Sequence, residues 1–308
     1  MSPSHATKSK AEGEDHAPVF LTLKHARRSY APRYWPSWSW LLLLRLIALL
    51  PLSWSRALGA ALGLLIMATN KKRRDIARVN LELCFPKLSL RERERLLRRH
   101  FIVSGQSYFD LAYLAWASQR RILRKTHIRG LEHYQGLRGR NIILLAPHCV
   151  GMNFGGAVIA GERAQFSMVK LQRNPVVNGL LNRGRMRFGC FLLARQQGLR
   201  PVIRGLKQGL AFYYLPDEDF GARQSVFVPF FGVPTATLTT LGRLARLTDA
   251  LVVPCFTRLL PGGRGYEVIL KPPLEDFPHG DRAHDAARMN AVIEEGLRHM
   301  PEQYLWTF

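Results

Sequence analysis

His148 stands in a segment whose residue types could support general-base chemistry. It follows an apolar run, Ile142 to Ala146, and a proline, as expected of a buried strand that ends in a polar turn. Imidazole is the side chain that most often takes a proton from a reacting hydroxyl near neutral pH. A carboxylate at the other ring nitrogen strengthens such a base, yet five residues downstream the chain has the amide Asn153. The segment therefore predicts a catalytic site. With an amide in place of the carboxylate, the strength of His148 as a base stays an open question.

Asn153 would contact His148 only in one geometry. Five residues turn a regular helix by about 140°, so the two side chains can meet only if His148 lies in the turn before a helix. The amide oxygen could then accept a hydrogen bond and orient the ring, but it brings no charge to stabilise imidazolium. Three explanations stay open: a natural variant with shifted activity, a relative that only binds, and a deliberate substitution.

Three further side chains near such a turn could carry chemistry. Asp217 and Asp219 follow the apolar run 211–215, which places two carboxylates at the end of a strand. A metal site or an acid pair would need a further ligand at a suitable spacing, and we expect no metal there. Cys149 beside His148 is expected to be a buried structural thiol rather than a nucleophile, because sequence neighbours need not touch.

Basic residues surround the same region and would suit an anionic substrate. Arg side chains can bind phosphate through two N–H groups, and Lys acts as a point charge. A solvated basic face is the alternative. Positions i and i+2 on a helix point apart, so at most two of the three arginines near 185 can reach one cleft. The candidates are Lys170, Arg173, Arg183, Arg185 and Arg187.

The pattern from residue 141 onward predicts an α/β fold with a mainly parallel sheet flanked by helices. Short apolar runs alternate with helix-length segments, and the working groups of such sheets gather at the carboxyl ends of strands. The expected strands are 142–146, 166–169, 211–215, 226–231, 251–256 and 266–270, and the expected helices are 156–164, 176–188, 238–247 and 282–299. Before them, 76–83 is amphipathic, and Ser89 and Glu92 form a capping box that opens a helix.

The N-terminal part predicts a membrane anchor. Residues 1–30 are polar and have the composition of a disordered lead, and an apolar stretch with clustered tryptophans occupies much of 31–75. A pair of core helices would give a similar pattern. The basic run from Lys71 to Arg74 favours an anchor on a cytosolic membrane face, because cations stay on that side and meet anionic headgroups.

Charge and cysteine content narrow the partners. The 308 residues carry 45 Lys and Arg against 22 Asp and Glu, a formal net charge of +23, so polyanions should be attracted. No nucleic-acid-binding signature accompanies that charge, and nucleic acid is not expected as a partner. The four cysteines lack metal-ligand spacing and suggest reduced thiols in a cytosol-facing protein without a cofactor.

Several ordered blocks over about residues 30–306 resemble the lipid A biosynthesis lauroyl/myristoyl acyltransferases. They are the His148 turn, 78–86 (RVNLELCFP), 183–187 (RGRMR), 215–221 (LPDEDFG), 225–232 (SVFVPFFG) and 301–306 (PEQYLW). The wider superfamily has a His-x4-Asp/Glu signature, from which Asn153 departs. The family's chains also usually continue into a His- and Arg-rich tail, whereas this sequence stops at Phe308.

The resemblance implies an acyltransferase at the cytoplasmic face of the bacterial inner membrane. Such an enzyme moves a fatty acyl chain from acyl carrier protein to a hydroxyl of a phosphorylated lipid A precursor, with His148 as base and the basic residues on phosphate. It implies a role for Asp217 and Asp219 in the polar wall of the cleft. The acyltransferase domain would span 76–308, with a helical part at 76–140 and the α/β core at 141–308. Two alternatives remain: a weak or inactive member that binds lipid or acts as a scaffold, and an acyltransferase for another hydroxylated lipid.

Overall fold

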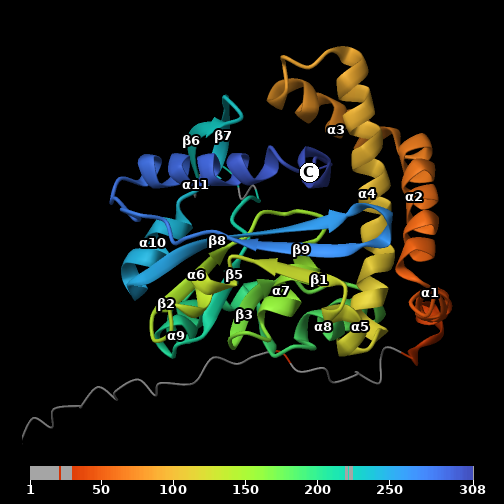
Figure 1. Cartoon of the computed structure of the whole chain (residues 1–308), viewed down its shortest axis with the longest axis horizontal. Coiled ribbons are helices and arrows are strands. Elements are labelled where there is room, and N and C mark those ends of the chain that lie inside the picture. Colours follow the sequence, from red (N-terminus) through yellow and green to blue (C-terminus); the bar gives the residue numbers. More distant parts are fainter. Residues whose placement is uncertain (1–20, 22–29, 219–220, 222–224, 308) are drawn as a thin grey trace, which may run out of the picture.

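A seven-stranded sheet forms the centre of the computed structural model, which describes residues 21, 30–218, 221 and 225–307 (Figure 1). The strand order is β1-β9-β8-β2-β5-β3-β4, and neighbours run parallel except β8 and β9. The expected α/β fold with a mainly parallel sheet is therefore confirmed. The strands are β1 (Thr126–Arg129), β2 (Asn141–Leu145), β3 (Gln165–Val169), β4 (Cys190–Ala194), β5 (Ala211–Tyr214), β8 (Ala250–Leu260) and β9 (Gly265–Leu270).

Helices cover both faces of this sheet, which explains why its central strand β2 is apolar and buried at every position after Asn141. Ile143 and Leu145 of β2 pack into a core with α9, α10 and α11, while Ile142 and Leu144 face a second core with α6 and α7. Alternate side chains of a strand point to opposite faces, so a strand buried on both faces needs no polar positions. The helices are α6 (Leu131–Gln135), α7 (Met152–Ile159), α8 (Pro175–Met186), α9 (Arg200–Lys207), α10 (Thr240–Thr248) and α11 (Arg282–Leu297).

Two features of the strands differ from the sequence expectation. The run 226–231 does not join the main sheet but forms an antiparallel hairpin of β6 (Ser225–Phe230) and β7 (Val233–Leu238) beside α11. Pro229 lies opposite Pro234 in this hairpin, and prolines supply no N–H for further pairing. β1 and β4 were not expected, because β1 is polar at every position except Ile128 and β4 lies within a longer mixed segment.

Within the described residues, the sheet is preceded by the helices α1 (Trp35–Ile47), α2 (Leu52–Thr69), α3 (Lys71–Cys84) and α4 (Leu90–Trp116), with the short α5 (Gln119–Leu123) after them. The predicted capping box at the start of α4 is confirmed, because the Ser89 hydroxyl accepts from the Glu92 amide and the Glu92 carboxylate accepts from the Ser89 amide. The expectation of a disordered lead at 1–30 falls almost wholly outside the described residues. Leu21, which is described, donates its amide to the Leu192 carbonyl of β4.

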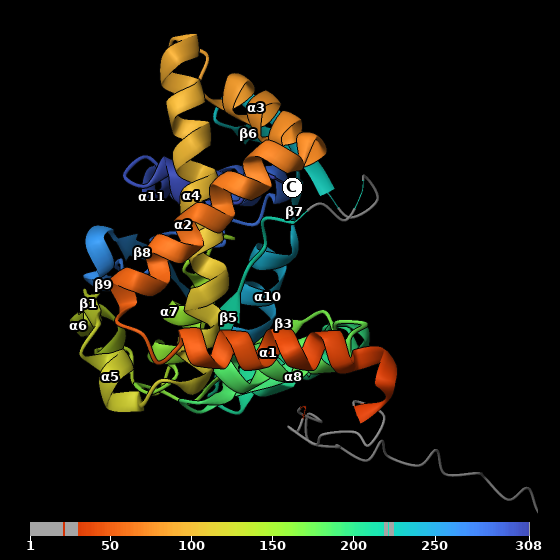
Figure 2. The ribbon, with the colours of Figure 1, turned by 90° about the vertical axis from the view of Figure 1, so that its right-hand side faces the viewer.

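α2 lies directly against α4, as Figures 1 and 2 show from two sides. Gly63 and Gly105 allow this approach, because a Cβ at either position would collide with backbone of the other helix. Arg56 of α2 is also buried, where it forms a 3.2 Å ion pair with Asp110 of α4 and donates to the Gly265 carbonyl of β9. These contacts attach α2 rigidly to the sheet domain.

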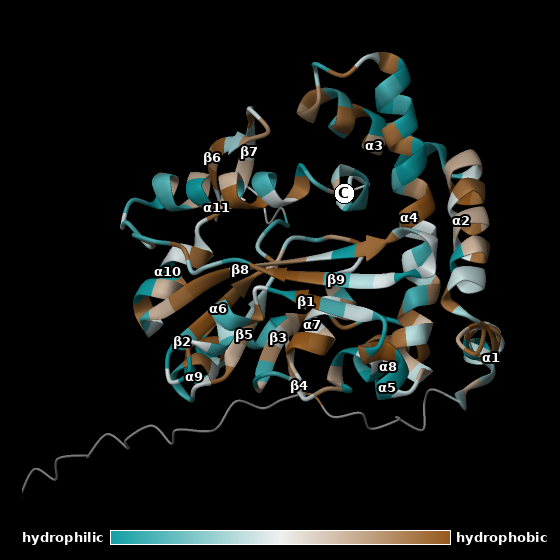
Figure 3. Ribbon diagram, viewed as in Figure 1, coloured by the Kyte–Doolittle hydropathy of each residue, from teal (hydrophilic) through white to brown (hydrophobic). Residues whose placement is uncertain are grey.

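α1 and α2 consist mostly of apolar and weakly polar residues (Figure 3), and most of their large exposed side chains are apolar, with Arg45 as an exposed cation. Of the helices in the described ranges, α2 alone is long and apolar enough to cross a membrane by length and composition. The exposed apolar side chains on the two helices are Trp35, Trp40, Leu42, Leu43, Leu46, Trp54, Leu58 and Leu65. A one-sided apolar surface of this kind is typical of contact with a membrane or a partner.

Candidate active site at the carboxyl edge of the sheet

Strand pairing brings His148 to Asp217. β2 and β5 are parallel neighbours with Leu145 opposite Tyr214, and His148 and Asp217 each lie three residues beyond that pair. The His148 ring bonds Asp217 Oδ1 through Nδ1 at 2.7 Å, and its main-chain N–H donates to Asp217 Oδ2 at 2.7 Å. One carboxylate therefore holds both the backbone and the ring of His148.

The second ring nitrogen of His148 faces Glu218. Nε2 lies 3.3 Å from Glu218 Oε1, and the other oxygen, Oε2, accepts a hydrogen bond from Arg195 Nη2 at 2.5 Å. Burial alone would lower the pKa of His148, but the bonds to Asp217 and Glu218 outweigh it and raise that pKa to about 9. The bond to His148 and the nearby Arg195 lower the pKa of Glu218 to about 2 against the effect of burial. At neutral pH His148 is therefore an imidazolium that lies between the side chains of Asp217 and Glu218.

The C-terminal segment fixes the turn around His148. The Leu305 N–H donates to the His148 carbonyl at 3.1 Å, and the Val150 N–H donates to the Gln303 carbonyl at 2.9 Å. Burial and the charge of Asp217 raise the pKa of Tyr304 well above its usual value, so its hydroxyl stays neutral beside that carboxylate. Backbone bonds from a distant segment therefore limit movement of the base.

Asn153 contacts an arginine instead of the His148 ring. Because α7 begins at Met152, Asn153 is carried around the first helical turn, and its Oδ1 accepts from Arg185 Nε at 2.7 Å. In the described part of the chain, the hydrogen bonds of the His148 ring go to Asp217 and Glu218. The geometry thus differs from the expected His148–Asn153 contact. Burial lowers the pKa of Arg185, and the Asn153 amide that accepts its hydrogen bond carries no charge.

Two of the expected phosphate-binding arginines cap a helix. Arg183 Nε donates to the Ala115 carbonyl at 3.2 Å, and Arg187 Nη1 donates to the Leu114 and Ala117 carbonyls at 2.8 and 2.5 Å. The last carbonyls of a helix lack partners within it and attract cations, so both arginines stabilise the end of α4. Arg185 points the other way, as the expected split of i and i+2 requires.

The remaining sequence candidates lie at the same edge of the sheet or outside the described residues. Val169 of β3 lies opposite Ala194 of β4. Lys170 comes directly after Val169 and is exposed, and Arg195 comes directly after Ala194. Arg173 is exposed in the loop between β3 and α8. Asp219 lies outside the described residues. Along the strand order β2-β5-β3-β4, the residues after the strand ends are first His148, then Asp217 and Glu218, and then the cations Lys170 and Arg195.

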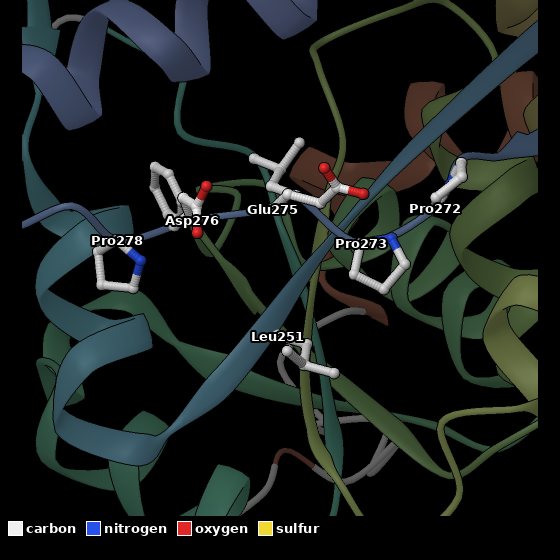
Figure 4. A pocket seen from close by; sticks show the side chains of 8 residues that line it. Leu251, Pro272, Pro273, Glu275, Asp276 and Pro278 are labelled. Atoms are coloured by element: carbon white, nitrogen blue, oxygen red, sulfur yellow. The ribbon is translucent and has the colours of Figure 1, made fainter.

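Cys149 is buried, and burial raises the pKa of its thiol well above the usual value. This agrees with a structural thiol. A hollow lined by Leu251 and 272–278 is shown in Figure 4. Leu251 pairs with Ile142 near the start of β2, so the hollow lies toward the opposite edge of the sheet from His148.

Three residues of the site were not predicted from the sequence: Glu218, Arg195 and Tyr304. Glu218 directly follows Asp217, so its position just after a strand could have indicated a site residue. Arg195 follows β4, a strand that the pattern did not reveal. Tyr304 belongs to the quoted block 301–306, but only the fold places that block beside β2 and β5.

The assembled groups can activate a hydroxyl beside an anionic substrate. A histidine bonded to an aspartate is suited to take a proton from a nucleophile and return it to a leaving group. Cations at the neighbouring strand ends can bind phosphate. Acyl transfer to the hydroxyl of a phosphorylated molecule needs both features.

Comparison with known proteins points to one enzyme family. The family model for bacterial lipid A biosynthesis acyltransferases matches residues 23–308. A lipid A biosynthesis acyltransferase of Haemophilus influenzae is 37% identical over 280 residues, which cover 89% of this chain and 87% of the relative. The lipid A biosynthesis lauroyltransferase of Escherichia coli K12 is 35% identical over 278 residues, 89% and 90% of the two chains. The palmitoleoyltransferase of the same organism is 31% identical over 292 residues, 94% of each chain.

These matches extend over the helices, the sheet and every strand end that contributes to the site. At this length and identity they show common descent and a common class of reaction. The chain therefore belongs to the bacterial lipid A biosynthesis acyltransferase family, and it is an acyltransferase.

Proposed function

We propose that this enzyme transfers a fatty acyl chain from acyl carrier protein to a hydroxyl of a phosphorylated lipid A precursor, with His148 as general base. The observation that carries the proposal is the 2.7 Å bond between His148 Nδ1 and Asp217. It supplies the charged partner that the sequence lacks at Asn153. A carboxylate at Nδ1 fixes the ring tautomer that exposes a lone pair at Nε2 and stabilises the imidazolium formed during reaction.

The reaction needs one base and no covalent enzyme intermediate. The acceptor hydroxyl gives its proton to His148 Nε2 while its oxygen attacks the thioester carbonyl carbon. The tetrahedral intermediate collapses, the C–S bond breaks, and the leaving thiolate takes the proton from Nε2. Asp217 stays ionised throughout. The products are the ester, the free thiol of the carrier and neutral His148.

Lys170, Arg173 and Arg185 are the proposed contacts for negative charge. Lys170 and Arg173 are exposed near the carboxyl edge of the sheet, where they can meet lipid phosphate. Arg185 is held by the amide of Asn153, which orients the guanidinium without neutralising it. A carboxylate at 153 would pair with that charge. The amide therefore leaves Arg185 available to a substrate anion.

A weak or inactive lipid-binding member is the second candidate. The observation behind it is Asn153 at the position of the signature acid. Asp217 weakens that argument, because it is only 8% exposed and bonds the ring directly. An acceptor lipid other than lipid A would need the same base and the same phosphate contacts, so a panel of acceptors is required to separate them.

We place the enzyme on the cytoplasmic face of the inner membrane, with α1 and α2 lying in the interface rather than spanning it. Three observations support this arrangement. α2 packs closely along α4 at Gly63 and Gly105, which favours a helix that stays with the domain. Most of the large exposed side chains on both helices are apolar. The exposed cations Lys71 and Lys72 follow α2 directly and suit anionic headgroups.

The test is an acyl-transfer assay with purified, detergent-solubilised enzyme. Acyl carrier protein loaded with chains of different length is offered with a tetraacylated lipid A precursor or another hydroxylated lipid, and added acyl mass is measured. His148→Ala should lower turnover by about 10²–10⁴, the usual contribution of a general base. His127→Ala, an exposed histidine on the far edge strand β1, is the matched control. A folded His148→Ala enzyme that keeps wild-type turnover would refute the proposed mechanism.

A further inference from the structure

Glu218 occupies the position at which a general base must receive its substrate. Its Oε1 lies 3.3 Å from His148 Nε2, and Asp217 holds the opposite ring nitrogen. A ring whose two nitrogens both face carboxylate oxygens carries a hydrogen on each nitrogen and donates an N–H hydrogen bond to each carboxylate. It therefore has no lone pair with which to accept a hydroxyl proton. The acceptor can reach the base only if Glu218 leaves.

We propose that Glu218 is a positioning residue that holds the place of the acceptor hydroxyl on His148 and passes wholly to Arg195 when the acceptor lipid binds. The inference rests on the proposed function, because it takes His148 as the base. The side chains of Glu218 and Arg195 are 37% and 36% exposed, whereas that of His148 is 17% exposed. Glu218 thus covers the ring from the solvent side. Its other oxygen already bonds Arg195, so it can leave the ring without losing every cationic partner.

The exchange moves one proton before the chemical step. As Glu218 leaves and the acceptor hydroxyl arrives, the Nε2 proton of the imidazolium passes to water, and the ring presents a lone pair to the hydroxyl. Glu218 and Asp217 remain ionised. Binding of the acceptor therefore releases one proton to the solvent, and the later steps balance as in the proposed reaction.

This arrangement would also select against water. In the absence of an acceptor, His148 stays protonated and covered, so it cannot activate water toward a bound thioester. Only a molecule that displaces Glu218 obtains the base. Glu218 therefore limits thioester hydrolysis and favours transfer to the lipid.

The pH dependence depends on the groups that face the ring or its carboxylates. Among the described residues these are Asp217, Glu218, Arg195, Cys149, Tyr214 and Tyr304. Burial raises the pKa of Cys149, Tyr214 and Tyr304, so these three stay neutral near neutral pH. With a His148 pKa of about 9, roughly 1% of the free enzyme carries neutral His148 at about pH 7.

The test compares kcat/KM for the acceptor against pH in the wild type, Glu218→Gln and Glu218→Ala. Glu132→Gln, which alters a carboxylate 74% exposed on α6, is the matched control. The wild-type value should rise with pH toward about 9, where neutral His148 accumulates. Loss of one of the two carboxylates should lower the His148 pKa. Each unit by which that pKa falls should raise kcat/KM near pH 7 about tenfold, because the neutral fraction of His148 rises by that factor. Thioester hydrolysis without acceptor should rise in both Glu218 variants and not in the control.

NMR titration of labelled histidine measures the His148 pKa and so tests its contact with Glu218 without an assay of activity. The His148 signal is assigned by its loss in His148→Ala. The His148 pKa should be lower in Glu218→Gln than in the wild type. An unmoved titration and an unmoved pH profile overturn the inference. A fall in kcat of a hundredfold in folded Glu218→Gln also overturns it, because Glu218 would then act in the chemical step. Full activity in His148→Ala would instead refute the proposed function, while the titration still reports on Glu218.

Discussion

Asp217→Asn is the substitution that most directly probes the base. Asp217 accepts two hydrogen bonds from His148, one from the main-chain N–H and one from ring Nδ1, each at 2.7 Å. An amide has one accepting end and one donating end. The main-chain N–H can only donate, so the amide oxygen must stay with it, and the NH₂ group must face Nδ1. The ring would then accept at Nδ1 and carry its proton at Nε2, which is the wrong tautomer for a base.

The expected loss follows from that tautomer. The same change in a serine protease triad lowers kcat by about 10⁴ for the same reason. We expect kcat to fall by about 10³–10⁴, equivalent to roughly 4–5.5 kcal/mol of transition-state stabilisation. The turn itself should survive, because the amide oxygen keeps the main-chain bond.

Single-turnover acyl transfer at saturating acceptor measures this loss. Thermal unfolding should show that the variant is folded. Asp249→Asn is the matched control, since Asp249 is 94% exposed and ends α10 in a left-handed conformation that Asn tolerates. A folded Asp217→Asn enzyme whose kcat falls less than about tenfold would refute the assignment of Asp217 as the partner of the base.

Two further substitutions test the surroundings of the site. Asn153→Asp should pair with Arg185 rather than with His148, so the pH profile should stay in place and kcat/KM for the phosphorylated acceptor should fall several-fold. A rise of about tenfold in kcat would show that the acid belongs with His148. Replacing both Leu58 and Leu65, which are 47% and 59% exposed on α2, with Glu should weaken binding to anionic phospholipid vesicles at least about a hundredfold, because each buried Leu contributes roughly 1.5–3 kcal/mol. Unchanged cosedimentation with the vesicles would contradict the interfacial placement of α2.

Local patterns were enough to predict the α/β fold, the strand and turn that carry His148, and the helix start at Ser89. Each of these follows from neighbours in the sequence: a run of apolar residues makes a buried strand, and a hydroxyl three residues before a glutamate caps a helix. The split between Arg185 and its neighbours at 183 and 187 was also predictable, because helical geometry sends i and i+2 apart. Which side of α8 faces the site could not be predicted from the sequence, because only the fold places the end of α4 against the other side of α8.

The partner of the base was decided by tertiary structure alone. Asn153 is five residues from His148, and the helical turn of α7 carries it away to Arg185. Asp217 is 69 residues away, and the parallel pairing of β2 with β5 brings it within 2.7 Å. The apolar run before His148 was enough to predict a histidine at the end of a strand, in a chain that resembles the acyltransferases. The carboxylates that contact the His148 ring and keep it protonated depend on the strand order. Packing between distant parts of the chain selects that order, because neighbours in a sheet need not be neighbours along the chain.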